Sequence, residues 1–276
     1  MGSGHEAKVR EYFDIAGPCF EALVGHTWHH GDPMAEARGC TVVEACRELE
    51  DDLIRIAGLR PGDRALDFGS GIGGPTLHMA AFTGASFVGL SNNEWLNQRA
   101  RYLASALDLD DRVSFLTTGD DDYRTLVAFA DGTFDAVTFF ESVCYLPDKP
   151  AFFAAAHRVL RPGARLVGID RLQRTFAEHL TEAQIMKLMT PVNDYFCIPA
   201  HGTLVSYRKM LEAAGFVVDV ARDMFEGVQC MSPDDRDDWL AYDGPDAEHL
   251  RAGKRTLDAA REAGVFTVGM FVAQKI

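Results

Sequence analysis

The sequence predicts an α/β fold built on an open, doubly wound sheet of seven strands. Three observations support this prediction. From residue 64 onward, short apolar runs alternate with helical patterns, which is typical of parallel strands joined by crossover helices. A run of glycines joins the first apolar run to the helix after it, and a last apolar run follows the final helix. The 276 residues, 47% of them hydrophobic, suffice for one large domain with an appendage or two small domains.

The segment before the sheet, residues 1–40, is expected to form helices and loops that act as a lid. It is rich in aromatic residues and histidines, and Gly17-Pro18 and Gly31-Asp32-Pro33 are turn signals. Residues 1–5 are interpreted as a tag remnant. The remainder, residues 41–276, is predicted to form the main domain.

Each later element has its own signal. Thr41 can cap a helix over residues 41–57, with Glu44 three residues on and apolar residues near helical spacing. Residues 172–203 depart from the strand–helix rhythm and are expected to form an irregular insertion that caps a ligand pocket. Strands are expected at residues 64–68, 85–90, 113–117, 134–140, 165–170, 216–220 and 265–273. Further helices are expected from the glycine run to about residue 82 and at residues 94–107, 149–160, 204–214 and 247–263.

Composition and charge exclude several classes of function. With 41 acidic and 27 basic side chains the net charge is −14, which repels phosphate backbones, so nucleic acid is not an expected partner. No membrane-spanning apolar window and no signal core are found, and the expected compartment is the cytoplasm. The six cysteines form no C-x-x-C pair, so neither a zinc site nor a disulfide framework is predicted. A homo-oligomer remains open.

The strongest motif is the glycine loop after the first predicted strand. Gly69, Gly71 and Gly74 match G-x-G-x-x-G between a strand and a helix, where missing Cβ atoms let the backbone approach a ligand. Dinucleotide and methyl-donor cofactors both use this geometry. A nicotinamide site wants an acid about 20 residues on, but residues 89–93 read Gly-Leu-Ser-Asn-Asn. Asp67, just before the loop, suits the ammonium end of S-adenosylmethionine, so the residues favour a methyl donor.

The residues around this loop resemble the class I S-adenosylmethionine-dependent methyltransferases. Within that class, residues 67–75, 82–85 and 88–94 look most like the sterol C24-methyltransferase branch and its prenyl-diphosphate C-methylating relatives. The likeness covers roughly residues 45–170. It implies a Rossmann-like methyltransferase sheet. It continues through Gly119-Asp120, Phe134-Asp135-Ala136-Val137, Glu141-Ser142 and the run from Arg158 to Gly163.

The resemblance also implies where the cofactor lies. Ser70 and the loop backbone would hold its methionine part, and the residues that end the second strand would meet its ribose, where many family members carry an acid. Asp120 would face the adenine amino group, and Tyr12 would contact the cofactor from the lid. The residues predicted to bind the cofactor are Asp67, Gly69, Ser70, Gly71, Ser91, Asn92, Asn93, Asp120, Glu141 and Tyr12.

Glu141 is the first candidate catalytic residue, because it ends the apolar fourth strand beside the cofactor. Partial burial is expected to raise its pKa toward the range of a general base, and the resemblance implies acid/base or orienting work. His29 is a candidate base for O- or N-methylation. His26 and His30 would share a helical face, but no third ligand is indicated and no metal is predicted.

These observations predict a methyltransferase acting on a small molecule, with C-methylation of a prenyl- or terpenoid-like metabolite as the leading chemistry. An O- or N-methyltransferase of a natural-product pathway is the alternative. A Rossmann oxidoreductase or a non-catalytic cofactor-binding protein is the alternative from another class. Mg²⁺ is expected only if the acceptor is a diphosphate. The residues expected to contact the acceptor are Trp28, His30, Tyr145, Tyr195 and Phe196.

Overall fold

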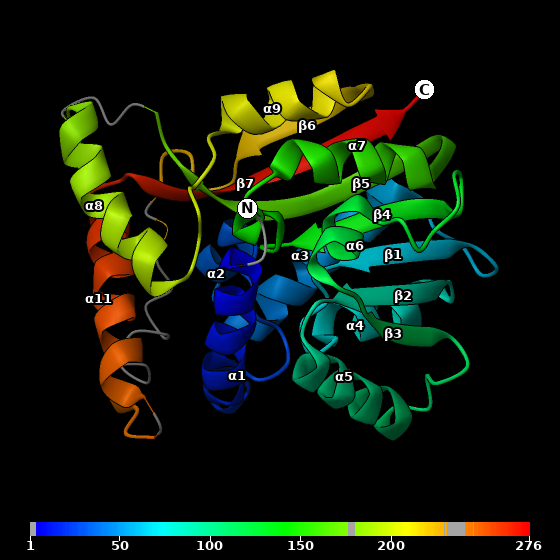
Figure 1. Cartoon of the computed structure of the whole chain (residues 1–276), viewed down its shortest axis with the longest axis horizontal. Coiled ribbons are helices and arrows are strands. Elements are labelled where there is room, and N and C mark those ends of the chain that lie inside the picture. The colour runs from blue at the N-terminus through cyan, green and yellow to red at the C-terminus, as the bar shows by residue number, and fades with distance from the viewer. Residues whose placement is uncertain (1–3, 176–179, 229, 231–240, 245) are drawn as a thin grey trace.

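A seven-stranded sheet in the order β3-β2-β1-β4-β5-β7-β6 organises the chain (Figure 1). The structure is a computed structural model that describes residues 4–175, 180–228, 230, 241–244 and 246–276. Strands β1 to β5 pair in parallel, and β7 runs antiparallel between β5 and β6. The strands are β1 Arg64–Phe68, β2 Ser86–Ser91, β3 Val113–Thr117, β4 Phe134–Phe140, β5 Leu160–Gln173, β6 Phe216–Asp223 and β7 Phe266–Lys275.

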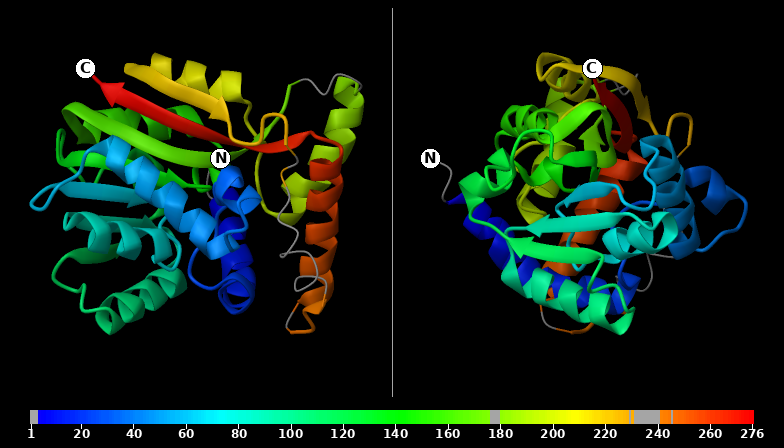
Figure 2. Two further views of the ribbon diagram at one scale, coloured as in Figure 1. Left: turned by 180° about the vertical axis from the view of Figure 1, so that it is seen from behind. Right: turned by 90° about the vertical axis from the view of Figure 1, so that its right-hand side faces the viewer.

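Helices cover both faces of this sheet, so the doubly wound α/β prediction is confirmed (Figure 2). Successive strand residues point to opposite faces and enter two separate cores. Ala65 packs with α3, α4 and α5, whereas its neighbour Leu66 packs with α6, α7 and α9. The described helices are α1 His5–Val24, α2 Pro33–Ala37, α3 Val42–Ala57, α4 Gly74–Thr83, α5 Glu94–Ala106, α6 Asp120–Thr125, the 3₁₀ turn η1 Val143–Tyr145, α7 Lys149–Val159, α8 Glu182–Tyr195, α9 Leu204–Ala213 and α11 Ala247–Glu262.

Helix α3 begins and ends as its sequence predicts. Thr41 Oγ1 accepts a hydrogen bond from the Glu44 amide, and the Glu44 carboxylate accepts from the Thr41 amide in return. The helix stops at Gly58, whose φ of +77° is a left-handed conformation that glycine adopts without strain. The capping residues therefore fix both ends of the helix.

Helix α1 differs from the prediction, because it runs straight through Gly17-Pro18 rather than turning there. The missing side chain of Gly17 explains the difference. A Cβ on Gly17 would lie 2.6 Å from the Trp95 ring of α5, so only glycine lets the two helices approach this closely. This contact favours a continuous helix despite the hydrogen bond that Pro18 cannot donate.

The insertion is also more regular than predicted. Residues 182–195 form α8, which begins with a capping box between Thr181 and Gln184 and packs against α11. Strand β5 continues to Gln173 because β7 pairs with it along that length. Helix α1 lies between the carboxyl ends of the strands and the α8–α11 pair (Figure 1).

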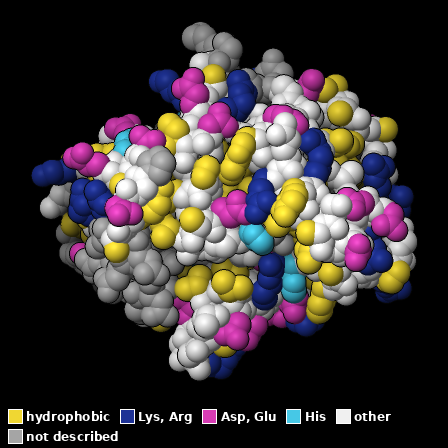
Figure 3. Space-filling model, turned by 90° about the horizontal axis from the view of Figure 1, so that it is seen from below, with side chains coloured by type: hydrophobic (Ala, Val, Ile, Leu, Met, Phe, Trp, Pro, Cys, Tyr) yellow, Lys and Arg dark blue, Asp and Glu magenta, His cyan; other side chains and the backbone are white. Residues whose placement is uncertain are grey.

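The outer surface mixes charges with apolar groups. On the face seen in Figure 3, acidic and basic side chains are interspersed among hydrophobic ones. In the part of the chain that the structure describes, no helix is both long and apolar enough to cross a membrane.

Candidate functional site

Two adjoining cavities lie at the carboxyl ends of the central strands. The first, of about 940 Å³, is lined by the glycine loop, the ends of β1, β2 and β4, and one side of α1. The second, of about 990 Å³, is lined by the other side of α1, residues 27–31, and the α8 and α11 helices. Glu141 and Arg171 line both cavities, so they lie in the wall between them.

The glycine loop forms a cradle at the first cavity. Gly69 has a φ of +73°, and a Cβ there would lie 2.2 Å from the Ser142 Cβ, so no larger residue fits. Gly71 has a φ of +55° and faces open space apart from the Trp28 ring at 3.8 Å. The buried Ser70 hydroxyl lines the cavity without a hydrogen-bond partner among the described residues. A cradle with an unpartnered hydroxyl suits a small polar ligand, as predicted for the methionine part of the cofactor.

Asp67 lies beneath this loop and also reaches the first cavity. Its two carboxylate oxygens accept hydrogen bonds from Thr76 Oγ1 at 2.5 Å and Thr138 Oγ1 at 2.8 Å. Burial raises the pKa of Asp67 to about 6, although both hydroxyl donors oppose the shift. The side chain is therefore ionised at neutral pH and takes up a proton just below it.

The residues after β2 divide between two tasks. Ser91 and Asn92, which are predicted to contact the ribose, line the first cavity. Asn93 does not line it, which is a correction to the prediction. Its Oδ1 accepts from the Leu96 amide to cap α5, and its Nδ2 donates to α1 at the Arg10 carbonyl and at Asp14 Oδ1. Attachment of α1 therefore occupies the amide nitrogen of Asn93, and helix capping uses its amide oxygen.

Of three further predicted residues, two line the cavities and the side chain of the third lies outside the described residues. Tyr12, predicted to contact the cofactor, lines the second cavity, and Tyr145, predicted to contact the acceptor, lines the first. The reason is that α1 faces both cavities, with Val9 toward the first and Tyr12 toward the second. The backbone of Asp120 opens α6 after β3, but its side chain lies outside the described residues.

Glu141 is held as an ion, contrary to the prediction that burial would raise its pKa. Its Oε1 accepts from the His30 amide at 2.7 Å and from His30 Nδ1 at 2.6 Å, and its Oε2 accepts from Arg171 Nε at 2.7 Å. Burial alone would raise the pKa of Glu141. The contacts with His30 and the guanidinium of Arg171 outweigh burial and lower this pKa well below its usual range.

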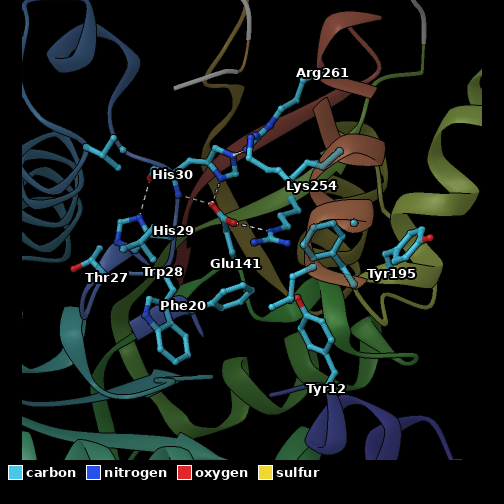
Figure 4. Close-up of a pocket in the computed structure, with 18 of the residues that line it drawn as sticks. Tyr12, Phe20, Thr27, Trp28, His29, His30, Glu141, Tyr195, Lys254 and Arg261 are labelled. Atoms are coloured by element: carbon cyan, nitrogen blue, oxygen red, sulfur yellow. Dashed lines mark hydrogen bonds and ion pairs between the residues drawn. The ribbon is translucent and has the colours of Figure 1, made fainter. Parts of the chain in front are cut away.

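His30 links Glu141 to the last helix (Figure 4). Its Nδ1 faces Glu141 and its Nε2 faces the Arg261 guanidinium of α11, so Nδ1 donates and Nε2 accepts. Burial and the guanidinium groups of Arg261 and Arg171 lower the pKa of His30 against the pull of Glu141. The imidazole is therefore neutral, and Arg261, His30, Glu141 and Arg171 form a continuous chain.

His29 has no free lone pair, so the structure does not support its predicted use as a base. Its Nε2 contacts Glu50 Oε1 at 3.0 Å and its Nδ1 contacts the His30 carbonyl at 2.8 Å, and both partners are acceptors. Burial disfavours the imidazolium, but Cys46 and Glu50 outweigh burial and raise the pKa of His29 well above its usual value. His29 is therefore a buried cation that fixes residues 27–31 to α3.

The prediction that His26 and His30 share a helical face is also wrong, because residues 26–32 form turns and coil rather than a helix. Within the described ranges, no group of three or more histidine, cysteine, aspartate or glutamate side chains could hold a metal ion.

The other predicted acceptor contacts, Trp28, Tyr195 and Phe196, do line the second cavity. Sequence reasoning missed Arg171, whose guanidinium lies 5.4 Å from the Phe196 ring. It also missed one face of α11, which contributes Leu250, Lys254, Leu257 and Arg261 to the cavity wall. Their spacing of four, three and four residues places them on one helical face, and that spacing was visible in the sequence.

Comparisons with known proteins agree with this geometry. The model of the methyltransferase domain family matches residues 37–220. The sterol 24-C-methyltransferase of Saccharomyces cerevisiae is 30% identical over 221 residues, which is 78% of this chain and 54% of that protein. The 27-O-demethylrifamycin SV methyltransferase of Amycolatopsis mediterranei is 35% identical over 161 residues, 58% of this chain and 56% of that protein. The chain thus spans about half the length of these curated relatives.

Among solved structures, the [4+2]-cyclase SpnF superimposes with a TM-score of 0.82 at 20% identity, covering 98% of this chain and 96% of that one. A likeness at this identity shows the fold alone, and a cyclase on this fold means that the fold does not fix the reaction. The family assignment rests instead on the domain match over residues 37–220. The chain therefore belongs to the methyltransferase domain family, which confirms its resemblance to the class I S-adenosylmethionine-dependent methyltransferases.

Proposed function

We propose that the protein uses S-adenosylmethionine to methylate a carbon atom of a small, largely apolar acceptor of the prenyl or terpenoid kind. Family membership supports the cofactor, and the first cavity fits it. Gly71 leaves open space for its methionine part, and the unpartnered Ser70 hydroxyl can bind a polar group there. When bound, S-adenosylmethionine supplies a methyl group on a positively charged sulfur.

The ionised Glu141 between the two cavities is the observation that favours carbon as the acceptor atom. A carboxylate with such a low pKa is a poor base for a phenol or an ammonium group. Methylation of an alkene instead creates a carbocation, whose protons are strongly acidic. A fixed carboxylate stabilises that positive charge as it develops.

Glu141 also has room to accept the proton that leaves the carbocation. A carboxylate offers about four acceptor positions, and His30 and Arg171 use two on Oε1 and one on Oε2. The remaining position on Oε2 has no hydrogen bond to the part of the chain that the structure describes. Aromatic faces from Phe20, Trp28 and Phe196 line the second cavity and can stabilise a cation further.

The lid serves the reaction by placing the acceptor and excluding water. Methyl transfer is an in-line displacement, so alignment of the acceptor carbon with the sulfur–methyl bond is the main requirement. Trp28 lines both cavities, and its Nε1 donates to the Gly25 carbonyl at 2.7 Å, which fixes the ring where the two cavities adjoin. Exclusion of water from this region would protect the carbocation from capture by water.

The proposal is tested by incubating the protein with methyl-labelled S-adenosylmethionine and a panel of prenyl and terpenoid alcohols, acids and diphosphates, sterols, phenols and amines. Reactions run with and without Mg²⁺, and mass spectrometry locates the label. We expect the label in a new carbon–carbon bond. Label found only on oxygen or nitrogen would overturn carbon methylation.

O-methylation is the second candidate, because the more identical of the two curated relatives is named for an O-demethylated substrate. With His29 fully bonded and Glu141 ionised, such an acceptor would have to lose its proton to solvent or to another group. Calorimetric titration with S-adenosylmethionine and with NAD tests the cofactor separately. Binding of NAD without binding of S-adenosylmethionine would overturn the methyltransferase proposal itself.

A further inference from the structure

We propose that the second cavity binds its ligand through a singly charged oxyanion, such as a carboxylate, held by Lys254 and Arg261 of α11. This inference rests on the proposed function only in calling that ligand the acceptor. It concerns the cationic end of the cavity, which is distinct from the wall shared with the first cavity.

Lys254 and Arg261 are buried cations that share a single carboxylate. They lie seven residues apart on α11, are 6% and 7% exposed, and line the cavity. Asp258 Oδ1 accepts from Lys254 Nζ at 2.7 Å and from Arg261 at 3.4 Å. Among the described residues, two positive charges therefore face one negative charge, which leaves this end of the cavity with about one unit of positive charge.

Arg261 also has an unused donor. One of its terminal nitrogens contacts the neutral ring of His30, but its buried Nε has no hydrogen-bond partner among the described residues. Leaving a buried charged donor unbonded is costly. A ligand oxygen would satisfy this donor and the excess charge together, and Figure 4 shows Arg261 and Lys254 on the same side of the cavity.

The other charges on the cavity wall do not replace this partner. Arg171 and Glu141 form an ion pair and cancel. Glu36, from α2, lies on the wall but has an interaction of its own. His29 also lines the wall and is paired with Glu50, and His30 is bonded to Glu141 and Arg261. The other described titratable groups of the wall are Tyr12, Tyr195 and His249. Around Lys254 and Arg261 the balance remains positive.

The size of this charge favours a monoanion over a diphosphate. A diphosphate would bring at least two negative charges against one uncompensated positive charge, and burying the surplus is unfavourable. The remainder of the wall includes Phe20, Trp28, Leu250 and Leu257, which suits an apolar body. The ligand is thus an amphipathic molecule with one anionic end.

A matched pair of fluorescent probes tests the site without knowledge of the natural acceptor. The dye 8-anilinonaphthalene-1-sulfonate has an apolar body and one anionic group, and N-phenyl-1-naphthylamine has the same body without the charge. Each is titrated into the full chain, with and without S-adenosylhomocysteine. We expect Lys254→Met to weaken binding of the sulfonate at least tenfold and to change binding of the neutral dye less than twofold.

Two further variants control the measurement. Lys187→Met removes the same charge from an exposed position on α8 and should leave both dyes unaffected. Asp258→Asn removes the shared carboxylate and should tighten sulfonate binding. Thermal unfolding of each variant checks that it is folded. Equal losses for the two dyes in Lys254→Met, or weaker sulfonate binding in Asp258→Asn, would overturn the proposal. Cofactor binding and label transfer are measured separately, so failure of the proposed function is distinguishable.

Discussion

Replacing Glu141 with glutamine should destabilise the protein and slow its reaction at the same time. The substitution keeps the shape of the side chain but removes its charge. The Arg171 guanidinium, whose side chain is 12% exposed, would then be a buried cation without a carboxylate. Breaking a buried pair by removing one partner costs about 3–5 kcal/mol. Because glutamine keeps one acceptor oxygen, we expect a loss near the lower end, about 3 kcal/mol.

In a chain of this size, about 3 kcal/mol corresponds to a fall in Tm of roughly 6–12 °C. Calorimetry measures that fall directly. Turnover should drop about 10²-fold or more, with binding of S-adenosylmethionine nearly unchanged. The matched control is Glu212→Gln, which makes the same chemical change in an exposed pair with Arg208 and should cost less than about 1 kcal/mol.

The pH dependence gives a second readout of the same interaction. The folded state lowers the pKa of Glu141, so its stabilising contribution is fully present above the unfolded pKa of about 4.3 and is lost as the pH falls below it. The stability gap between the wild type and Glu141→Gln should therefore be constant from pH 5 to neutrality and narrow in more acidic solution.

A double variant isolates the buried charge. Replacing Arg171 with methionine in the Glu141→Gln background removes the unpaired cation and should recover part of the lost stability, although not the activity. If Glu141→Gln unfolds at the wild-type temperature, or if the double variant is less stable than the single one, the ion-pair reasoning is refuted. Loss of cofactor affinity with an unchanged rate of the bound complex would instead assign Glu141 to cofactor orientation.

Three further outcomes are expected. Gly69→Ala should weaken S-adenosylmethionine binding at least tenfold in calorimetric titration, because the added Cβ would meet Ser142. The control is Gly58→Ala, at a similar φ but in open space. It should lower the free energy of unfolding by only about 1 kcal/mol and leave cofactor binding intact. Cofactor affinity should decline as the pH falls through about 6, where Asp67 takes up a proton. Asp67→Asn should bind the cofactor weakly at every pH, without this decline. If the affinity of the variant depends on pH as that of the wild type does, Asp67 is not part of the cofactor site. Glu50→Gln should lower the Tm by several degrees because it removes the carboxylate shared by the buried His29 cation and Arg47. Arg47→Met, which removes only the Arg47 pair, is the control, and an equal Tm for the two variants would contradict a charged His29.

Local sequence patterns predicted most of the fold because they act over a few residues. The capping box at Thr41 and the glycine loop at Gly69 depend on neighbours within one turn, and both formed where expected. The same kind of signal marked Thr181 and Gln184 at the start of α8, where the surrounding irregular spacing concealed it. Pro18 was misleading for the opposite reason, since the contact that favours a continuous helix comes from Trp95, far along the chain.

The electrostatics of the site could not be predicted in this way. Glu141 follows a wholly apolar strand, so its sequence neighbours indicate a raised pKa. The groups that lower it are His30, 111 residues earlier, and Arg171, 30 residues later. The sign of the shift therefore depends on tertiary contacts that local patterns do not reveal. The role of α11 as a cavity wall was hidden for the same reason.

Helix α1 has one further consequence, which follows from its position between the two cavities. Val9 and Phe13 line the first cavity, and Tyr12 and Val24 line the second. One helix therefore forms part of the wall of both cavities. Gly17 lets this helix pack closely against Trp95 of α5. A ligand that shifts α1 on one side must alter the free energy of binding on the other. Such thermodynamic linkage is reciprocal. Binding of one ligand in the first cavity and of another in the second is then cooperative rather than independent.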